Sequence, residues 1–144
     1  MRFAVGALAL GLVMSGGAKA QDATGTWFNE DKDGMVQIAA CGRALCGKVV
    51  WIRDAIDKDT GRPPVDKKNS NPALRTRPIV GLQVLSELKP STTPNRWDGR
   101  VYNIDDGKTY TARVTLRAPN ELRVDGCVAL ICRGETWSRG TLPH

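Results

Sequence analysis

Apolar and polar residues alternate along much of this 144-residue chain. The pattern is clearest in residues 108–117, where every second side chain is apolar: Tyr110, Ala112, Val114 and Leu116. The positions between them hold threonine and arginine. Alternation with a period of two indicates a half-buried antiparallel strand whose apolar side chains face a core.

Other segments have the composition of short strands bounded by turns. They are residues 25–29, 35–40, 47–53, 79–88, 97–103, 121–125 and 133–139. In residues 79–88, one side is predicted to carry Val80, Leu82, Val84 and Leu88. No window shows a convincing helical stripe of apolar residues with caps. About eight short strands predict an all-β fold, either a sandwich or an up-and-down barrel, and a barrel removes exposed strand edges.

One long connection interrupts this rhythm. Residues 54–78 are rich in Pro, Gly, Asp, Asn and Lys and show no strand pattern. Loops of this length are usually functional or mobile. We therefore expect residues 54–78 to be either part of a functional site or mobile.

The N-terminus has the three parts of a secretory signal peptide. Arg2 is followed by an apolar run over residues 3–14 and by the small-x-small sequence Ala18-Lys19-Ala20. The run is shorter than the roughly 20 residues that span a bilayer, which disfavours the alternative of an uncleaved anchor. We predict a signal peptide at residues 1–20, cleavage after Ala20, and a single periplasmic or secreted domain at residues 21–144. No later segment is apolar enough to be transmembrane.

Net charge changes this picture little. The chain carries +6, and loss of Arg2 and Lys19 with the signal peptide leaves +4. This mild excess favours solubility and loose contact with anionic surfaces. An exported protein without a longer basic tract is not expected to bind nucleic acid.

The four cysteines fall into two pairs with the same spacing. Cys41 and Cys46 are five residues apart, as are Cys127 and Cys132. In an oxidising compartment an even number of cysteines indicates disulfides, and four cysteines allow three pairings. We favour 41–46 and 127–132, each across the mouth of a hairpin. A four-thiolate zinc site is the alternative.

Gly25, Trp27 and Arg139 resemble the signature of the calycin barrels, which include lipocalins, fatty-acid-binding proteins and avidins. This resemblance implies that Trp27 closes the floor of a barrel and that Arg139 packs across its ring. A guanidinium over an indole contributes about 0.5–2 kcal/mol. The expected fold is therefore an all-β, small antiparallel calycin-like barrel of about eight strands.

A broader resemblance covers nearly the whole chain after residue 20. Its pieces are Gly25-Thr26-Trp27, Cys41 with Cys46-Gly47-Lys48-Val49-Val50-Trp51, Asn71–Leu82, Trp97 with Gly99, Gly107–Tyr110 and Cys132–Arg139. They are similar in type and order to the family of secreted bacterial proteins known as domain of unknown function 2147. The family implies a compartment and a fold but no activity.

The residues needed for common enzyme mechanisms are missing from the predicted domain. The only histidine is His144, the last residue, so a nucleophile–histidine arrangement is not expected. Asp105 and Asp106 precede Gly107, a pattern typical of a turn. Residues 57–61 resemble the start of a calcium loop but lack its later ligands. We therefore predict a non-enzymatic protein without metal or cofactor.

Candidate ligand contacts lie on the long loop and among the aromatic residues. Arg75 and Arg77 are two apart on an extended segment, so they face the same way and could bind a carboxylate or phosphate. The alternative is that they pair with nearby carboxylates. Four aromatic residues could line a cavity or fill the core: Trp51, Trp97, Tyr102 and Tyr110.

The tip of the predicted second hairpin is unusually apolar. Residues 128–131 read Val-Ala-Leu-Ile between two cysteines. Such a tip could cap the barrel, meet a partner or touch a membrane surface. The leading hypothesis is a module that binds a small, partly apolar or anionic ligand at the barrel mouth beneath residues 54–78. The alternative is an envelope protein-interaction module with a filled barrel.

Overall fold

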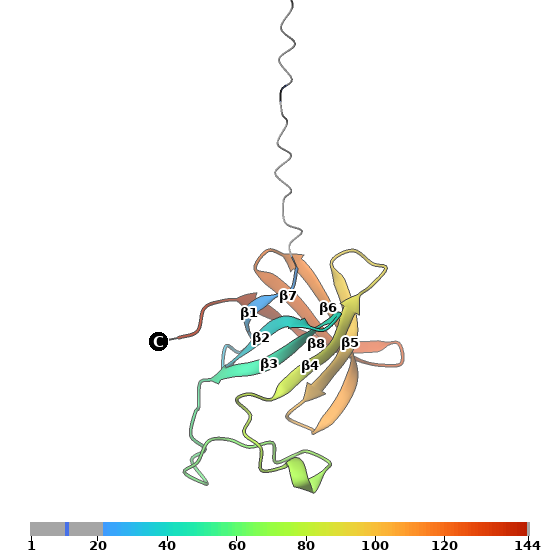
Figure 1. The fold of residues 1–144 in the computed structure, drawn as a ribbon. Coiled ribbons are helices and arrows are strands. Elements are labelled where there is room, and N and C mark those ends of the chain that lie inside the picture. Colours follow the sequence, from blue (N-terminus) through green and yellow to red (C-terminus); the bar gives the residue numbers. More distant parts are fainter. Residues whose placement is uncertain (1–10, 12–21, 144) are drawn as a thin grey trace, which may run out of the picture.

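The computed structural model describes residue 11 and residues 22–143. The predicted signal peptide and its cleavage site, apart from residue 11, lie outside the described residues, as does His144. The domain boundary at residue 21 therefore stays a prediction. Figure 1 shows the described part as one barrel with a long loop at its lower end.

Eight strands and one short 3₁₀ helix make up the fold. The strands are β1 (Gly25–Phe28), β2 (Gly34–Cys41), β3 (Ala44–Ile52), β4 (Gln83–Pro90), β5 (Arg96–Asn103), β6 (Lys108–Ala118), β7 (Glu121–Val128) and β8 (Ile131–Arg139). The helix η1 (Pro72–Leu74) lies in the long loop. In the described part of the chain, no helix has both the length and the hydrophobicity needed to span a bilayer.

Each strand pairs antiparallel with the next one along the chain, and β1 pairs with β8 to close the barrel. The prediction of an all-β antiparallel barrel of eight strands is confirmed. In such a topology, alternate turns lie at the same end. The β1–β2, β3–β4, β5–β6 and β7–β8 connections therefore share one end, called here the open end, and the remaining turns share the floor.

The predicted alternation holds along β6, where Ala112, Val114 and Leu116 are buried in the barrel core. It fails around β4. The strand predicted from residue 79 begins at Gln83, and Val80, predicted to face inward, is 46% exposed. The Gly81 N–H donates to the Val49 carbonyl at 2.7 Å, so this segment reaches β3 before the regular ladder begins.

A tight side-chain arrangement closes the barrel floor. Trp27 is fully buried, and its indole Nε1 donates to the Ala23 carbonyl at 2.9 Å. The Arg139 guanidinium lies 4.2 Å from the centre of the Trp27 ring. Its nitrogens donate to three carbonyls, those of Thr24 (2.7 Å), Pro119 (3.0 Å) and Asp22 (3.3 Å). One side chain from the last strand thereby joins three chain segments around the tryptophan.

Both predicted disulfides are present, and the described residues contain no free cysteine. Cys41–Cys46 joins β2 to β3 near the floor, and Cys127–Cys132 joins β7 to β8 at the open end. The last residue pairs of the two ladders are Cys41–Ala44 and Val128–Ile131, so each hairpin turns through only two residues. Each disulfide therefore holds a short turn rather than a four-residue loop.

Candidate functional site

The barrel is hollow at its open end. The cavity has a volume of about 1050 Å³ and extends from the turns at the open end between the strands toward the floor. Its wall is built from inward-facing apolar side chains: Val36, Val49, Val84, Val101 and Val124. Pro64 and Ile79 of the β3–β4 connection add to this wall. Between the cavity and the floor, large side chains such as Leu88 and Leu122 are fully buried and fill the barrel.

A buried carboxylate holds the long loop against the barrel. Asp66 is fully buried and accepts three side-chain hydrogen bonds. The donors are the Tyr102 hydroxyl (2.6 Å), the Asn69 amide (2.9 Å) and Arg77 Nε (3.0 Å). Within the loop, the Asp66 N–H also donates to the Arg77 carbonyl at 2.9 Å, which holds two segments of the loop together. The loop is therefore an ordered part of the site, docked on β5 through Tyr102.

These contacts set the protonation of the two acidic groups. Burial alone would raise the pKa of Asp66, but hydrogen bonds from Tyr102, Asn69 and Arg77 together with the Arg77 charge hold it below its usual value. Burial and the neighbouring Asp66 carboxylate raise the pKa of Tyr102. At neutral pH the pair is therefore an ionised carboxylate that accepts from a neutral phenol.

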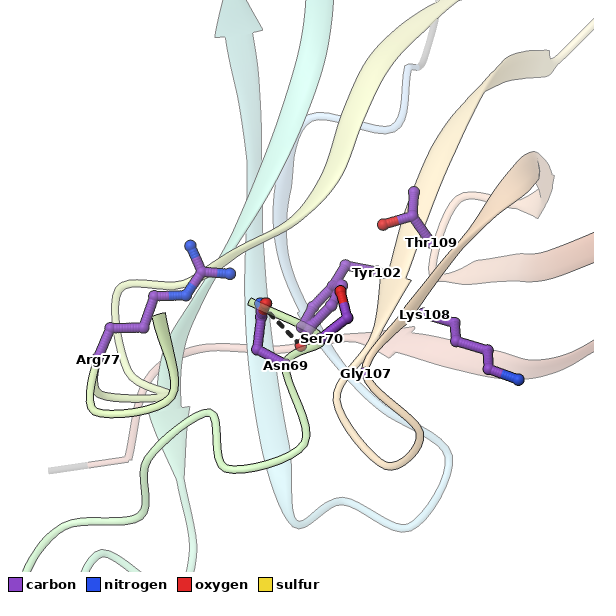
Figure 2. A pocket seen from close by; sticks show the side chains of 7 residues that line it. All are labelled: Asn69, Ser70, Arg77, Tyr102, Gly107, Lys108 and Thr109. Carbon is purple, nitrogen blue, oxygen red and sulfur yellow. Dashed lines mark hydrogen bonds between the residues drawn. The ribbon is translucent and has the colours of Figure 1, made fainter. Parts of the chain in front are cut away.

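A second contact packs the loop against the β5–β6 turn. A Cβ atom at Gly107 would lie 1.9 Å from the Lys68 carbonyl oxygen, and the Gly107 backbone has a φ of +72°. Only glycine fits both conditions. Beside this contact is a smaller pocket of about 500 Å³, lined by Asn69, Ser70, Arg77, Tyr102, Gly107, Lys108 and Thr109. Figure 2 shows Lys108 directed away from Arg77 and from the Asn69–Tyr102 hydrogen bond.

Gly107→Ala is expected to release this part of the loop. The added methyl group cannot coexist with the Lys68 carbonyl, so tryptic cleavage at the exposed Lys67 and Lys68 should become about tenfold faster. Gly61→Ala is the matched control, because Gly61 lies in the same loop with a φ of +69° but has open space around it. Equal cleavage rates in the two variants would contradict the docking contact.

The structure brings the two predicted tyrosines together at the cavity. Tyr102 and Tyr110 both line it, and the Tyr110 hydroxyl donates to Asp106. Trp51 instead packs edge to face against Phe28, with ring centres 6.1 Å apart. Trp97 is buried in the core cluster. In the described part of the chain, Trp51 and Trp97 line neither the cavity nor the smaller pocket.

The two predicted arginines are engaged by the loop itself. Arg75 Nε donates to the Asn69 carbonyl at 2.7 Å, and Arg77 pairs with Asp66 while also lying 5.9 Å from the Tyr102 ring centre. Arg77 lines the smaller pocket, and Arg75 lines neither cavity. A ligand-anchoring role for these arginines stays a prediction, and the smaller pocket is where Arg77 could fulfil it.

The apolar hairpin tip stands at the rim of the cavity. Val128 and Ile131 line the cavity yet are 63% and 68% exposed, and Leu130 is 99% exposed. The tip therefore does not cap the barrel by burying itself. It leaves an apolar lip beside the entrance, held in place by the Cys127–Cys132 disulfide.

None of the described carboxylates at the site was predicted as a site residue from the sequence. Asp66 holds the loop, and five aspartates line the cavity together with Glu135, which accepts from Trp137 Nε1 at 2.6 Å. Burial, with the nearby charges of Glu30 and Asp31, raises the pKa of Glu135. Glu135 lies on β8 in the run Arg-Gly-Glu-Thr, which has no alternation of apolar and polar residues. Only the strand register shows that Glu135 faces the cavity.

A closed barrel of eight antiparallel strands, with a tryptophan–arginine floor and a cavity at the other end, is a lipocalin-like fold. Protein HP1028 from Helicobacter pylori, described as belonging to the lipocalin family, has a similar solved structure with a TM-score of 0.66. The sequences are 24% identical over 82% of each chain, so this likeness shows the fold alone.

The family profile of domain of unknown function 2147, an uncharacterized protein conserved in bacteria, matches residues 25–139. The chain belongs to this family, as its motifs predicted. Among curated proteins, none matches the chain significantly.

Proposed function

We propose that this protein is a non-enzymatic binding module that holds a small, partly apolar ligand in the barrel cavity. The observation that carries this proposal is the cavity itself. Its volume of about 1050 Å³ is at the upper end of the roughly 300–1000 Å³ typical of small-molecule sites. A barrel of eight strands is otherwise just wide enough to be filled by its own side chains.

The lining supports a ligand with both apolar and polar parts. Valines from five strands line the cavity and provide apolar surface. Tyr102 and Tyr110 also line it and provide hydroxyl groups. Binding in such a site removes apolar ligand surface from water, which favours association by about 25 cal/mol per Å² before the costs of ordering. The docked loop shapes one side of the entrance.

We further propose that the protein works in the periplasm or outside the cell. Two disulfides and membership of a bacterial family agree with an oxidising compartment. The predicted signal peptide and the cleavage after Ala20 remain part of this proposal. Sequencing the N-terminus of protein isolated from the periplasm tests both.

Filling the cavity is expected to abolish binding. Gly126 lines the cavity opposite the buried Ala112, and a Cβ there would have ordinary contacts of 3.4 Å with Tyr110 and Val101. The rest of a Gly126→Trp side chain must therefore extend into the cavity. Titration calorimetry with octanol, a neutral and partly apolar probe, should show binding to the wild type that weakens at least about tenfold in the variant.

Thr111→Trp is the control, because Thr111 is an exposed residue of the neighbouring strand β6. Gly126→Leu is a milder plug, should tryptophan disturb the fold. Equal octanol binding by the wild type and the plugged variants would overturn the proposal, as would a wild type that binds neither octanol nor its charged analogues octylamine and octanoate. It would leave an envelope protein-interaction module as the better account, with the exposed tip at Val128, Leu130 and Ile131 as its contact.

A further inference from the structure

Charged side chains are distributed unevenly around the cavity. The chain has 21 basic and 15 acidic residues, so an average patch of its surface would be basic. The cavity lining reverses this balance. It contains one basic residue, Arg133, and six acidic ones: Asp31, Asp33, Asp54, Asp105, Asp106 and Glu135.

The acidic residues come from separate parts of the sequence that the barrel brings to one end. Asp31 and Asp33 lie in the β1–β2 turn, Asp54 follows β3, and Asp105 and Asp106 lie in the β5–β6 turn. Glu135 completes the set from β8. We call these six residues the acidic rim. The turns at the floor, in contrast, are residues 42–43, 91–95 and 119–120, and none of them contains a carboxylate.

The charge of the acidic rim is not neutralised within the described residues. The three ion pairs found there are Arg77–Asp66, Arg96–Asp98 and Arg123–Asp125, and none includes a rim residue. Asp33 and Asp106 accept hydrogen bonds from the uncharged groups of Asn29 and Tyr110. The carboxylates of the rim thus have no ion-pair partner within the described residues, and an excess of acidic groups at the entrance of a cavity with apolar walls concentrates cations.

The rim is too widely spread to hold a metal ion. Among the described residues, no group of three or more His, Cys, Asp or Glu side chains is close enough to ligate one. Separated carboxylates above valine walls are instead suited to a larger organic cation, with its apolar part in the barrel. The aromatic ring of Tyr110 also lines the cavity, and such a ring attracts an organic cation that lies over its face.

We propose that the cavity selects an organic cation, an amine or quaternary ammonium that carries an apolar chain or ring. This inference rests on the proposed binding function and names its ligand class. The smaller pocket differs in its lining, which has the basic residues Arg77 and Lys108 and no acidic one.

The test compares three probes that share one chain and differ in charge: octylamine, octanol and octanoate. Titration calorimetry on the mature protein at low ionic strength is expected to show octylamine binding about tenfold more tightly than octanoate, with octanol between them. Raising the salt concentration should reduce this preference, because exposed charges are screened.

The variant Asp31→Asn/Asp54→Asn/Asp105→Asn removes half of the rim charge. All three residues are exposed, and their side chains make no hydrogen bond within the described chain, so the fold should persist. This variant is expected to lose most of the preference for octylamine. The control Asp59→Asn/Glu87→Gln/Glu121→Gln removes the same charge at exposed positions outside the cavity lining and should keep it.

The outcomes separate this inference from the function on which it rests. Octanol binding without a preference for octylamine, or a preference that the rim variant keeps in full, would overturn the cation inference and leave the binding function standing. Binding of none of the three probes would overturn both.

Discussion

Trp27→Ala is expected to lower the free energy of unfolding by about 4 kcal/mol. Trp27 is fully buried, so the substitution leaves a large cavity in the barrel floor and an Ala23 carbonyl without its indole donor. The position is critical for a second reason. β1 is only four residues long, and it pairs with β8 through two residue pairs, Trp27–Arg139 and Phe28–Ser138. Side-chain packing must therefore hold the barrel closed where the hydrogen-bond ladder is short. Urea denaturation followed by circular dichroism measures the loss.

A double-mutant cycle with Arg139→Ala tests whether the two side chains act together. Arg139→Ala alone is expected to cost about 2 kcal/mol, from the lost contact with the Trp27 ring and the unpaired carbonyls. The double variant should lose less than the sum of the single variants by about 1 kcal/mol. Arg113→Ala, at an exposed position of β6, should change stability by no more than about 0.5 kcal/mol. Strictly additive losses would show that the floor contact contributes nothing.

The strands of the barrel were predictable because burial on one face leaves a repeat of two in the sequence. β6 shows this most clearly, since Ala112, Val114 and Leu116 are buried between exposed residues such as Arg113. The disulfides were predicted from the cysteine spacing and the expected compartment. The strand repeat and the cysteine spacing are both local features of the sequence. An up-and-down barrel pairs each strand with its neighbour in sequence, so local features were sufficient to predict most of the fold.

The errors lie where distant contacts override the local pattern. Around β4 the register shifts between Ser86 and Lys89, and Glu87 adopts a φ of +54°, so Leu85 and Leu88 are both buried although they are three apart. A period of two cannot reveal such a bulge. Asp66 was missed for a similar reason, because it stands in a polar run whose partner Tyr102 is 36 residues away.

The acidic rim could have been inferred from the sequence once the barrel topology was assumed. Alternate turns share an end, and the β1–β2 and β5–β6 turns read Glu-Asp-Lys-Asp at residues 30–33 and Asp-Asp-Gly at residues 105–107. Taken singly, each is typical of a turn, and the structure agrees: the Lys108 N–H donates to Asp106 at 2.8 Å. Their shared location, and not their composition, gives them a second role.

Asp66→Asn is expected to destabilise the docked loop by about 2 kcal/mol at pH 7. Asparagine has nearly the same shape, but it replaces one acceptor oxygen with an NH₂ group. At the Oδ2 position that group would face Arg77 Nε and the Asn69 amide, which are both donors, and at the Oδ1 position it would replace the acceptor of the Tyr102 hydroxyl. The charge that pairs with Arg77 is lost as well. Cleavage by trypsin at Lys67 and Lys68, together with urea denaturation, would report the loosened loop.

The dependence of this effect on pH distinguishes the charge from the shape of the side chain. The pKa of Asp66 is lower in the folded protein than its ordinary value of about 3.9, so its ionisation stabilises the fold above that value. This stabilisation disappears as the pH falls through the folded-state pKa. The difference between wild type and Asp66→Asn should therefore shrink in acid, where the wild-type carboxyl group is also neutral.

Asp59→Asn provides the matched control, because it removes a carboxylate from the exposed part of the same loop. It should leave the free energy of unfolding within about 0.5 kcal/mol of the wild type at every pH. The rate of tryptic cleavage should likewise be unchanged. Two results would contradict the account of the loop. One is an Asp66→Asn variant as stable as the wild type at pH 7. The other is a loss of the same size in acid, which would mean that packing, and not the charged hydrogen-bond network, holds the loop against Tyr102.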